Sequence, residues 1–91
     1  MQVLLYGGCA GDSDTPYSLQ LGRERAESIR QYLIDSGIEE ARLTAVSVPV
    51  QQNPYHVYGL GTDSEEASVN RHTVIVDAST DFARLILQNA Q

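Results

Sequence analysis

The first half of the chain has a hydrophobic pattern that predicts one strand followed by one helix. The apolar run 3–6 stops at two glycines, and a helix of that length would be marginal, so this run predicts a buried strand. Residues 17–36 form the strongest helical pattern, because apolar side chains recur at helical spacing while polar ones occupy the other faces. Gly37 suits the left-handed position after a helix, and Ile38 would complete a Schellman motif there.

The second half predicts two further strands and a second helix. Residues 43–50 alternate loosely between apolar and polar and predict a strand that ends at Pro49 or soon after. Residues 73–76 are strongly β-branched and predict a third, short strand. Residues 79–89 have an amphipathic helical pattern. The expected caps of this helix are Ser79 or Thr80, and its expected apolar face consists of Phe82, Leu85 and Ile86.

Two loops complete the chain. Residues 7–16 are rich in glycine and small polar residues, and residues 51–64 are polar and aromatic. Asp63 or Ser64 is expected to cap a short helical turn that continues to Val69. The order of elements predicts a single α+β domain spanning residues 1–91, in which a small mixed sheet of about three strands packs against two helices.

The size, charge and cysteine content of the chain exclude several functional classes of protein. The 91 residues leave no room for a second domain, and the net charge of −6 argues against a nucleic-acid binder or docking on an anionic membrane. A lone cysteine excludes an intramolecular disulfide, no Cys/His set has zinc-site spacing, and we expect no metal and no cofactor. No apolar run approaches the ~20 residues of a membrane span, so we expect no membrane insertion. The N-terminus does not have the pattern of a signal peptide, which favours the cytoplasm, a virion or a secretion assembly.

The spacing of several residues resembles the OmpA-like domain, the peptidoglycan-binding module of outer-membrane and flagellar-motor proteins. The resemblance covers about residues 7–76, and the predicted helix 79–89 would be an addition to it. The residues that carry it are Tyr17, then Leu21-Gly22-Arg23-Glu24-Arg25-Ala26, Ile29, Tyr32-Leu33, Gly37-Ile38, Arg42-Leu43 and Asn70-Arg71.

The resemblance implies a binding site for the diaminopimelate of the peptidoglycan stem peptide. In that family an arginine at the start of the helix pairs with the free carboxylate, and an aspartate in the preceding loop meets the amine. A planar guanidinium suits such a carboxylate because it binds both oxygens at once. The corresponding ligand-binding residues here would be Arg25, Arg71, Asp12, Tyr17 and Ser18.

This chain also departs from the family pattern. An ungapped count from Arg25 places Ala10, not an acid, at the family's aspartate position, and Asp12 or Asp14 substitutes only if the loop is redrawn. The second arginine of the closing Asn-Arg-Arg motif is His72. The glycines expected after the second strand are replaced by Ser47 and Pro49. The family's first strand and first helix have no counterpart in this sequence, which is therefore either a trimmed piece or a shortened descendant. We favour the shortened descendant, in which we expect helix 79–89 to cover the sheet face that the lost helix covered, giving a truncated OmpA-like sandwich.

The same residues have alternative roles. Arg25 could be one of several polar residues in the first helical turns, solvated or paired to an acid such as Asp12, and Arg71 could neutralise Asp12 or Asp14 across the loop. Cys9 lies between a predicted strand and helix, where amides and a helix N-terminus lower a thiol pKa, with His56 or His72 as conceivable bases. A buried, unreactive cysteine is the commoner case, and no signature joins the three residues, so we expect no enzyme.

Two functions therefore compete. In the first, the chain is a non-enzymatic structural or assembly component of a larger complex, of the secretion-machine or phage-tail type, with a degenerate peptidoglycan pocket. Its partners would then be other protein subunits, paired through a sheet edge that the shortened fold leaves open. The alternative is a working peptidoglycan-binding domain that recognises the stem peptide.

Overall fold

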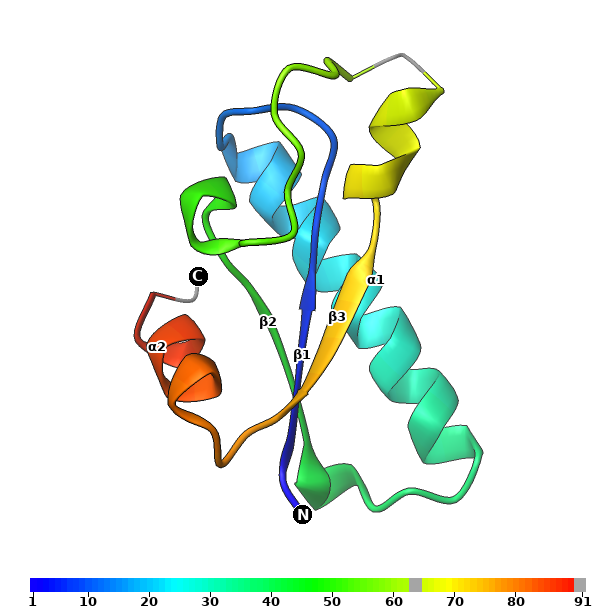
Figure 1. The fold of residues 1–91 in the computed structure, drawn as a ribbon. Helices are drawn as coiled ribbons and strands as arrows, with labels where there is room; N and C mark the ends of the chain where they lie inside the picture. Colours follow the sequence, from blue (N-terminus) through cyan, green and yellow to red (C-terminus); the bar gives the residue numbers. More distant parts are fainter. Residues whose placement is uncertain (63–64, 90–91) are drawn as a thin grey trace.

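The computed structural model describes residues 1–62 and 65–89, in three layers (Figure 1). A three-stranded sheet in the order β2-β1-β3 lies between two helices, and β1 pairs parallel with β2 and antiparallel with β3. The elements are β1 (Val3–Gly7), α1 (Pro16–Asp35), β2 (Leu43–Ser47), β3 (Thr73–Asp77) and α2 (Asp81–Asn89), with short 3-10 turns at Glu40–Arg42, Val50–Gln52 and Glu66–Asn70. The expected mixed sheet and its two helices are confirmed. In the described part of the chain, no helix is long and apolar enough to cross a membrane.

The central strand β1 is buried on both faces because its side chains alternate between two cores. Leu4 and Tyr6 point to the α2 side, where they pack with Ile86. Leu5 points to the other side and packs with Ala26 of α1. The apolar run 3–6 therefore supplies both cores of a small domain.

The ends of α1 follow from local sequence. Thr15 and Ser18 form a capping box, in which the Thr15 hydroxyl accepts from the Ser18 N–H at 3.0 Å and the Ser18 hydroxyl accepts from the Thr15 N–H at 2.9 Å. At the other end Gly37 has a φ of 104°, and the Ile38 N–H donates to the Leu33 carbonyl at 3.0 Å. This is the predicted Schellman motif.

Two expectations about side chains and boundaries are wrong. The strand predicted over 43–50 ends at Ser47, because Pro49 has no N–H for the sheet and Val50–Gln52 form a 3-10 turn. Leu85 is 52% exposed, so Ala83 takes the buried position beside Ile86 that Leu85 was expected to share. The expected cap at 63–64 lies outside the described residues, and the helical turn that follows is the 3-10 turn Glu66–Asn70.

A contact between two glycines positions the end of β1 against α1. A Cβ atom added to Gly7 would lie 2.0 Å from the Gly22 carbonyl oxygen, and one added to Gly22 would lie 2.8 Å from the Gly7 carbonyl oxygen. Because any side chain would separate the two backbones, glycine at both positions lets the loop after β1 lie directly against the first turns of the helix.

Candidate functional site

A groove of about 500 Å³ lies where the loop after β1 meets the start of α1, and we call it the arginine groove. Four of the five predicted ligand-binding residues line it, namely Arg25, Arg71, Tyr17 and Ser18. The fifth, Asp12, is not among its lining residues. The remaining lining residues are Cys9, Ala10, Gly11, Ser13, Thr15, Leu21 and Thr62.

Arg25 holds the loop as well as lining the groove. Its Nη1 donates to the Gly8 carbonyl at 2.6 Å and to the Cys9 Sγ at 3.1 Å. These bonds fix the guanidinium in place, so that its charge is oriented before any ligand arrives. They also give Arg25 a structural role, although within the described residues it bonds to Gly8 and Cys9 and not to an acid such as Asp12, as considered from the sequence.

The other predicted residues contribute in different ways. Arg71 is exposed, and its Nη2 donates to the Thr62 carbonyl. Tyr17 is 70% exposed, which leaves its ring open to solvent at the groove. The Ser18 hydroxyl is used in the capping box, where it also donates to the Thr15 carbonyl at 3.0 Å. Among the described residues, no ion pair joins Arg25 or Arg71 to Asp12 or Asp14.

Asp12 is bonded to the loop after β2 instead. Its Oδ1 lies 2.9 Å from His56 Nε2, and its Oδ2 accepts from the Gly59 N–H at 2.8 Å. The hydrogen bond from His56, followed by that from Gly59, lowers the pKa of the Asp12 carboxyl below its ordinary value. Asp14 has a similar role, because its Oδ1 accepts from the Val50 N–H at 2.8 Å.

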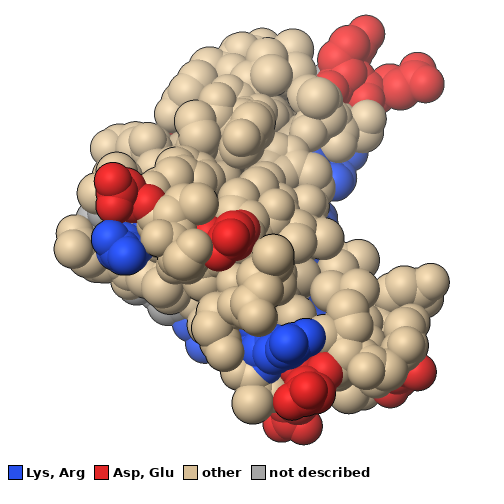
Figure 2. Space-filling view, turned by 60° about the horizontal axis from the view of Figure 1, so that its bottom comes forward, with Lys and Arg blue, Asp and Glu red and all other residues tan. Residues whose placement is uncertain are grey.

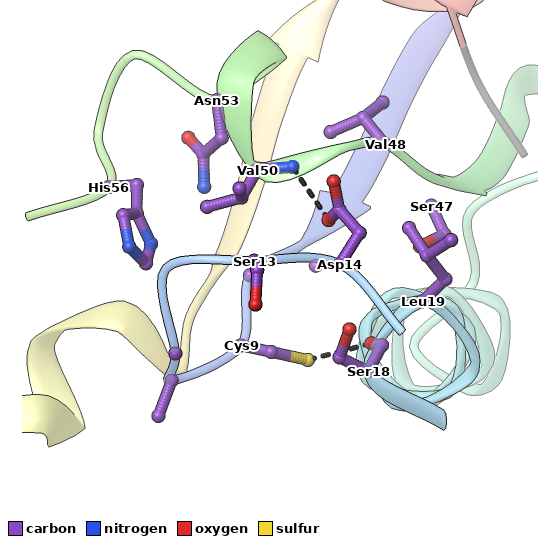
Figure 3. Close-up of a pocket in the computed structure, with 14 residues that line it drawn as sticks. Cys9, Ser13, Asp14, Ser18, Leu19, Ser47, Val48, Val50, Asn53 and His56 are labelled. Atoms are coloured by element: carbon purple, nitrogen blue, oxygen red, sulfur yellow. Dashed lines mark hydrogen bonds between the residues drawn. The ribbon is translucent and has the colours of Figure 1, made fainter. Parts of the chain in front are cut away.

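A small cavity of about 20 Å³ lies beside the groove and shares part of the same loop (Figure 3). Cys9, Ser13 and Asp14 line it on the side of the glycine-rich loop, and Asn53 and His56 on the side of the loop after β2. The His56 side chain is 1% exposed, and its Nδ1 has no hydrogen-bond partner in the described structure. The cavity has room for about one water molecule, which a buried polar nitrogen commonly binds.

Cys9 does not have the surroundings of a nucleophile. Its thiol donates to the Ser18 carbonyl at 2.9 Å, and burial raises its pKa, although the charge of Arg25 acts in the opposite direction. Both candidate bases are bonded elsewhere. His56 faces Asp12, while His72 has its Nδ1 2.8 Å from the Val69 carbonyl and its Nε2 3.1 Å from the Asn53 amide.

One face of the molecule shows how its charged side chains are spread. On the face shown in Figure 2, arginines and acids stand in small, separate groups on a mostly uncharged surface. Among the described residues, no three His, Cys, Asp or Glu side chains gather in a way that could hold a metal ion.

No protein-family profile matches this chain, and no curated protein or solved structure matches it. The OmpA-like resemblance therefore rests on the residues and spacing given above. Seven of the groove-lining residues were not predicted as ligand contacts, and Leu21 and Thr62 are two of them. Leu21 could have been found because it precedes Arg25 by four residues and so shares its helix face. Thr62 carried no local signal, since a long loop brings it there.

Proposed function

We propose that this chain is a non-enzymatic OmpA-like module that serves as a structural component of a larger protein assembly, and that its peptidoglycan pocket is degenerate. The observation that carries this proposal is the position of Asp12. Its two carboxylate oxygens bond to His56 and Gly59, and Asp12 does not line the arginine groove.

The missing acid matters because the diaminopimelate end of the stem peptide carries both a carboxylate and an amine. Two guanidinium groups favour the carboxylate but repel the ammonium. Among the described residues that line the groove, none is Asp or Glu. The positive charge of the groove therefore complements the carboxylate of that ligand but not its amine. We infer that the fold functions through contacts with other protein subunits.

A second candidate is a working peptidoglycan-binding domain, and one observation favours it. Arg25, Arg71, Tyr17 and Ser18, chosen from sequence alone, all line the same groove.

Co-sedimentation with diaminopimelate-type peptidoglycan sacculi separates the two candidates. The variant to compare is Arg71→Gln, because within the described residues the Arg71 side chain bonds to a loop carbonyl alone, whereas removing Arg25 would release the Gly8 end of β1 from α1. Arg84→Gln is the matched control, since Arg84 lies on α2, pairs with Asp81 and undergoes the same change of charge.

We expect the protein to remain in the supernatant, with no difference among the wild type, Arg71→Gln and Arg84→Gln. Sedimentation of the wild type that is lost in Arg71→Gln but kept in Arg84→Gln would overturn the proposal and establish the second candidate.

A further inference from the structure

β3 is an edge strand whose outer backbone groups can be identified. The Gly8 N–H donates to the His72 carbonyl at 2.6 Å, and the Ala78 N–H donates to the Gln2 carbonyl at 2.9 Å. Because hydrogen-bonded pairs alternate along an antiparallel ladder, Val74 and Val76 also bond to β1. The backbone groups of Thr73, Ile75 and Asp77 therefore point to the open edge.

The same three residues lie on the sheet face that α1 only partly covers. Ile75 pairs with Leu5, whose side chain packs against α1, yet Ile75 is 54% exposed. The described core on this face joins α1 to β1 and β2 and includes no residue of β3. A hollow of about 300 Å³ lies between α1 and the start of β3, and it is lined by Leu21, Glu24, Arg25, Ser28, Ile29 and Thr73.

Apart from the charge of Asp77 at its end, this edge lacks the features that usually prevent strands from pairing between molecules. Natural edge strands are commonly protected by lysine, proline, a bulge or an inward-pointing charge. The sequence from Thr73 to Val76 is Thr-Val-Ile-Val, with no charge and no proline. A run of β-branched residues favours an extended backbone, and so favours addition of another strand.

We propose that β3 pairs antiparallel with β3 of a second copy of this chain, about a twofold axis at Ile75, to form a six-stranded sheet. This inference rests on the proposed assembly role, for which it names a partner. In this register the two Ile75 residues exchange a pair of backbone hydrogen bonds, and the Thr73 carbonyl of each copy accepts from the Asp77 N–H of the other. The Asp77 carbonyl already accepts from Thr80, so four new backbone bonds form.

Charge complementarity favours a second copy as the occupant. The register places Asp77 of each copy opposite Thr73 of the other, and Arg71 precedes Thr73 by two residues. Glu24 and Arg25 both line the hollow beside Thr73, so their charges offset each other there. The acid at the end of each strand thus lies near Arg71 at the start of its partner, which favours the antiparallel orientation.

Sedimentation equilibrium of the full chain over a range of concentrations tests this dimer. The variant Ile75→Lys would place two like charges opposite each other at the axis. Thr44→Lys is the matched control, because Thr44 is an exposed residue of the other edge strand, β2, and gains the same charge. Ile75→Pro is a second variant, since it removes an N–H that points away from β1 and leaves the existing ladder bonds intact.

We expect the wild type and Thr44→Lys to dimerise with dissociation constants within about threefold of each other. Ile75→Lys and Ile75→Pro should weaken the dimer at least tenfold while keeping the wild-type circular dichroism spectrum. A wild type that stays monomeric up to millimolar concentration would overturn the inference, and so would a dimer that Ile75→Lys leaves unchanged.

The sacculus experiment reports separately on the proposed function. A monomer that does not sediment with sacculi contradicts the dimer but not the assembly role with other subunits. A dimer that binds sacculi through Arg71 contradicts the degenerate pocket but not the β3 pairing.

Discussion

The sheet with its helices and the loop end of the molecule are held together by different forces. In the sheet, fully buried apolar side chains such as Leu4, Leu5 and Ala26 pack between layers. At the loop end, which comprises residues 8–15, 48–62 and 65–72, polar side chains bond to backbone groups that no strand or helix satisfies. Asn70 and Asp12 are examples. Irregular backbone in a small domain needs such partners, because a buried N–H or C=O without one is costly.

The largest expected effect is in the sheet. Leu5→Ala removes a fully buried side chain from the core between β1 and α1, and we expect it to lower the free energy of unfolding by about 2–5 kcal/mol. Urea denaturation monitored by circular dichroism measures this change. The control is Leu85→Ala, since Leu85 is 52% exposed and should change stability by less than about 0.5 kcal/mol. Equal losses in the two variants would contradict the two-core arrangement.

This contrast between the sheet and the loop end explains which parts of the fold the sequence predicts well. The spacing of apolar residues correctly predicted three strands and two helices, because it indicates which side chains are buried. It failed at Leu85, since an amphipathic pattern defines an apolar stripe but not which residue of the stripe faces the sheet. It also extended β2 past Ser47, where the alternation continues although the backbone has turned.

The loop end could not be predicted in this way, because its bonds join residues that are far apart in the chain. Asp12 bonds to His56 and Gly59, which follow it in the sequence by 44 and 47 positions. No local sequence pattern links a carboxylate in one loop to its partners in another. The predicted ligand-binding residues include some that the sequence placed correctly and one that it did not. Residues on α1 were placed together by helical spacing and line one groove, whereas Asp12, which depends on the path of the loop, does not line it.

An intermediate effect is expected at Asn70, the most buried polar residue of the loop end. Its Oδ1 accepts from the Val57 N–H at 2.8 Å, and its Nδ2 donates to the Val57 carbonyl at 2.9 Å. Asn70→Ala leaves both backbone groups without a partner, so we expect a loss of about 1–3 kcal/mol in the free energy of unfolding. Faster hydrogen exchange of the Val57 amide should accompany it. Ser68→Ala, an exposed change in the same 3-10 turn, is the control, and an Asn70→Ala protein as stable as this control would show that Asn70 does not hold the loop.

The smallest expected effect is the acid sensitivity of Asp12, and its sign follows from the pKa of the carboxyl. Hydrogen bonds from His56 and Gly59 lower that pKa in the folded protein. The stabilisation they provide is therefore complete above the unfolded pKa, near 4, and is lost as the pH falls through the folded value. Asp12→Asn should unfold at a lower temperature than the wild type at neutral pH, and the difference should shrink as the solution is acidified. Thermal unfolding between about pH 2 and 7 measures this.

Glu39→Gln is the matched control for this change, because it removes one negative charge from an exposed residue whose carboxylate accepts no hydrogen bond within the described residues. It separates the specific bonds of Asp12 from the general relief of charge repulsion in a protein with a net charge of −6. If Asp12→Asn and Glu39→Gln show the same pH profile, the bonds of Asp12 contribute nothing to stability, and the loop end is held by its other hydrogen bonds. A pH dependence of thermal unfolding that is specific to Asp12→Asn would show that this carboxylate stabilises the loop. Its bonds to His56 and Gly59 would then explain why Asp12 does not line the groove beside Arg25.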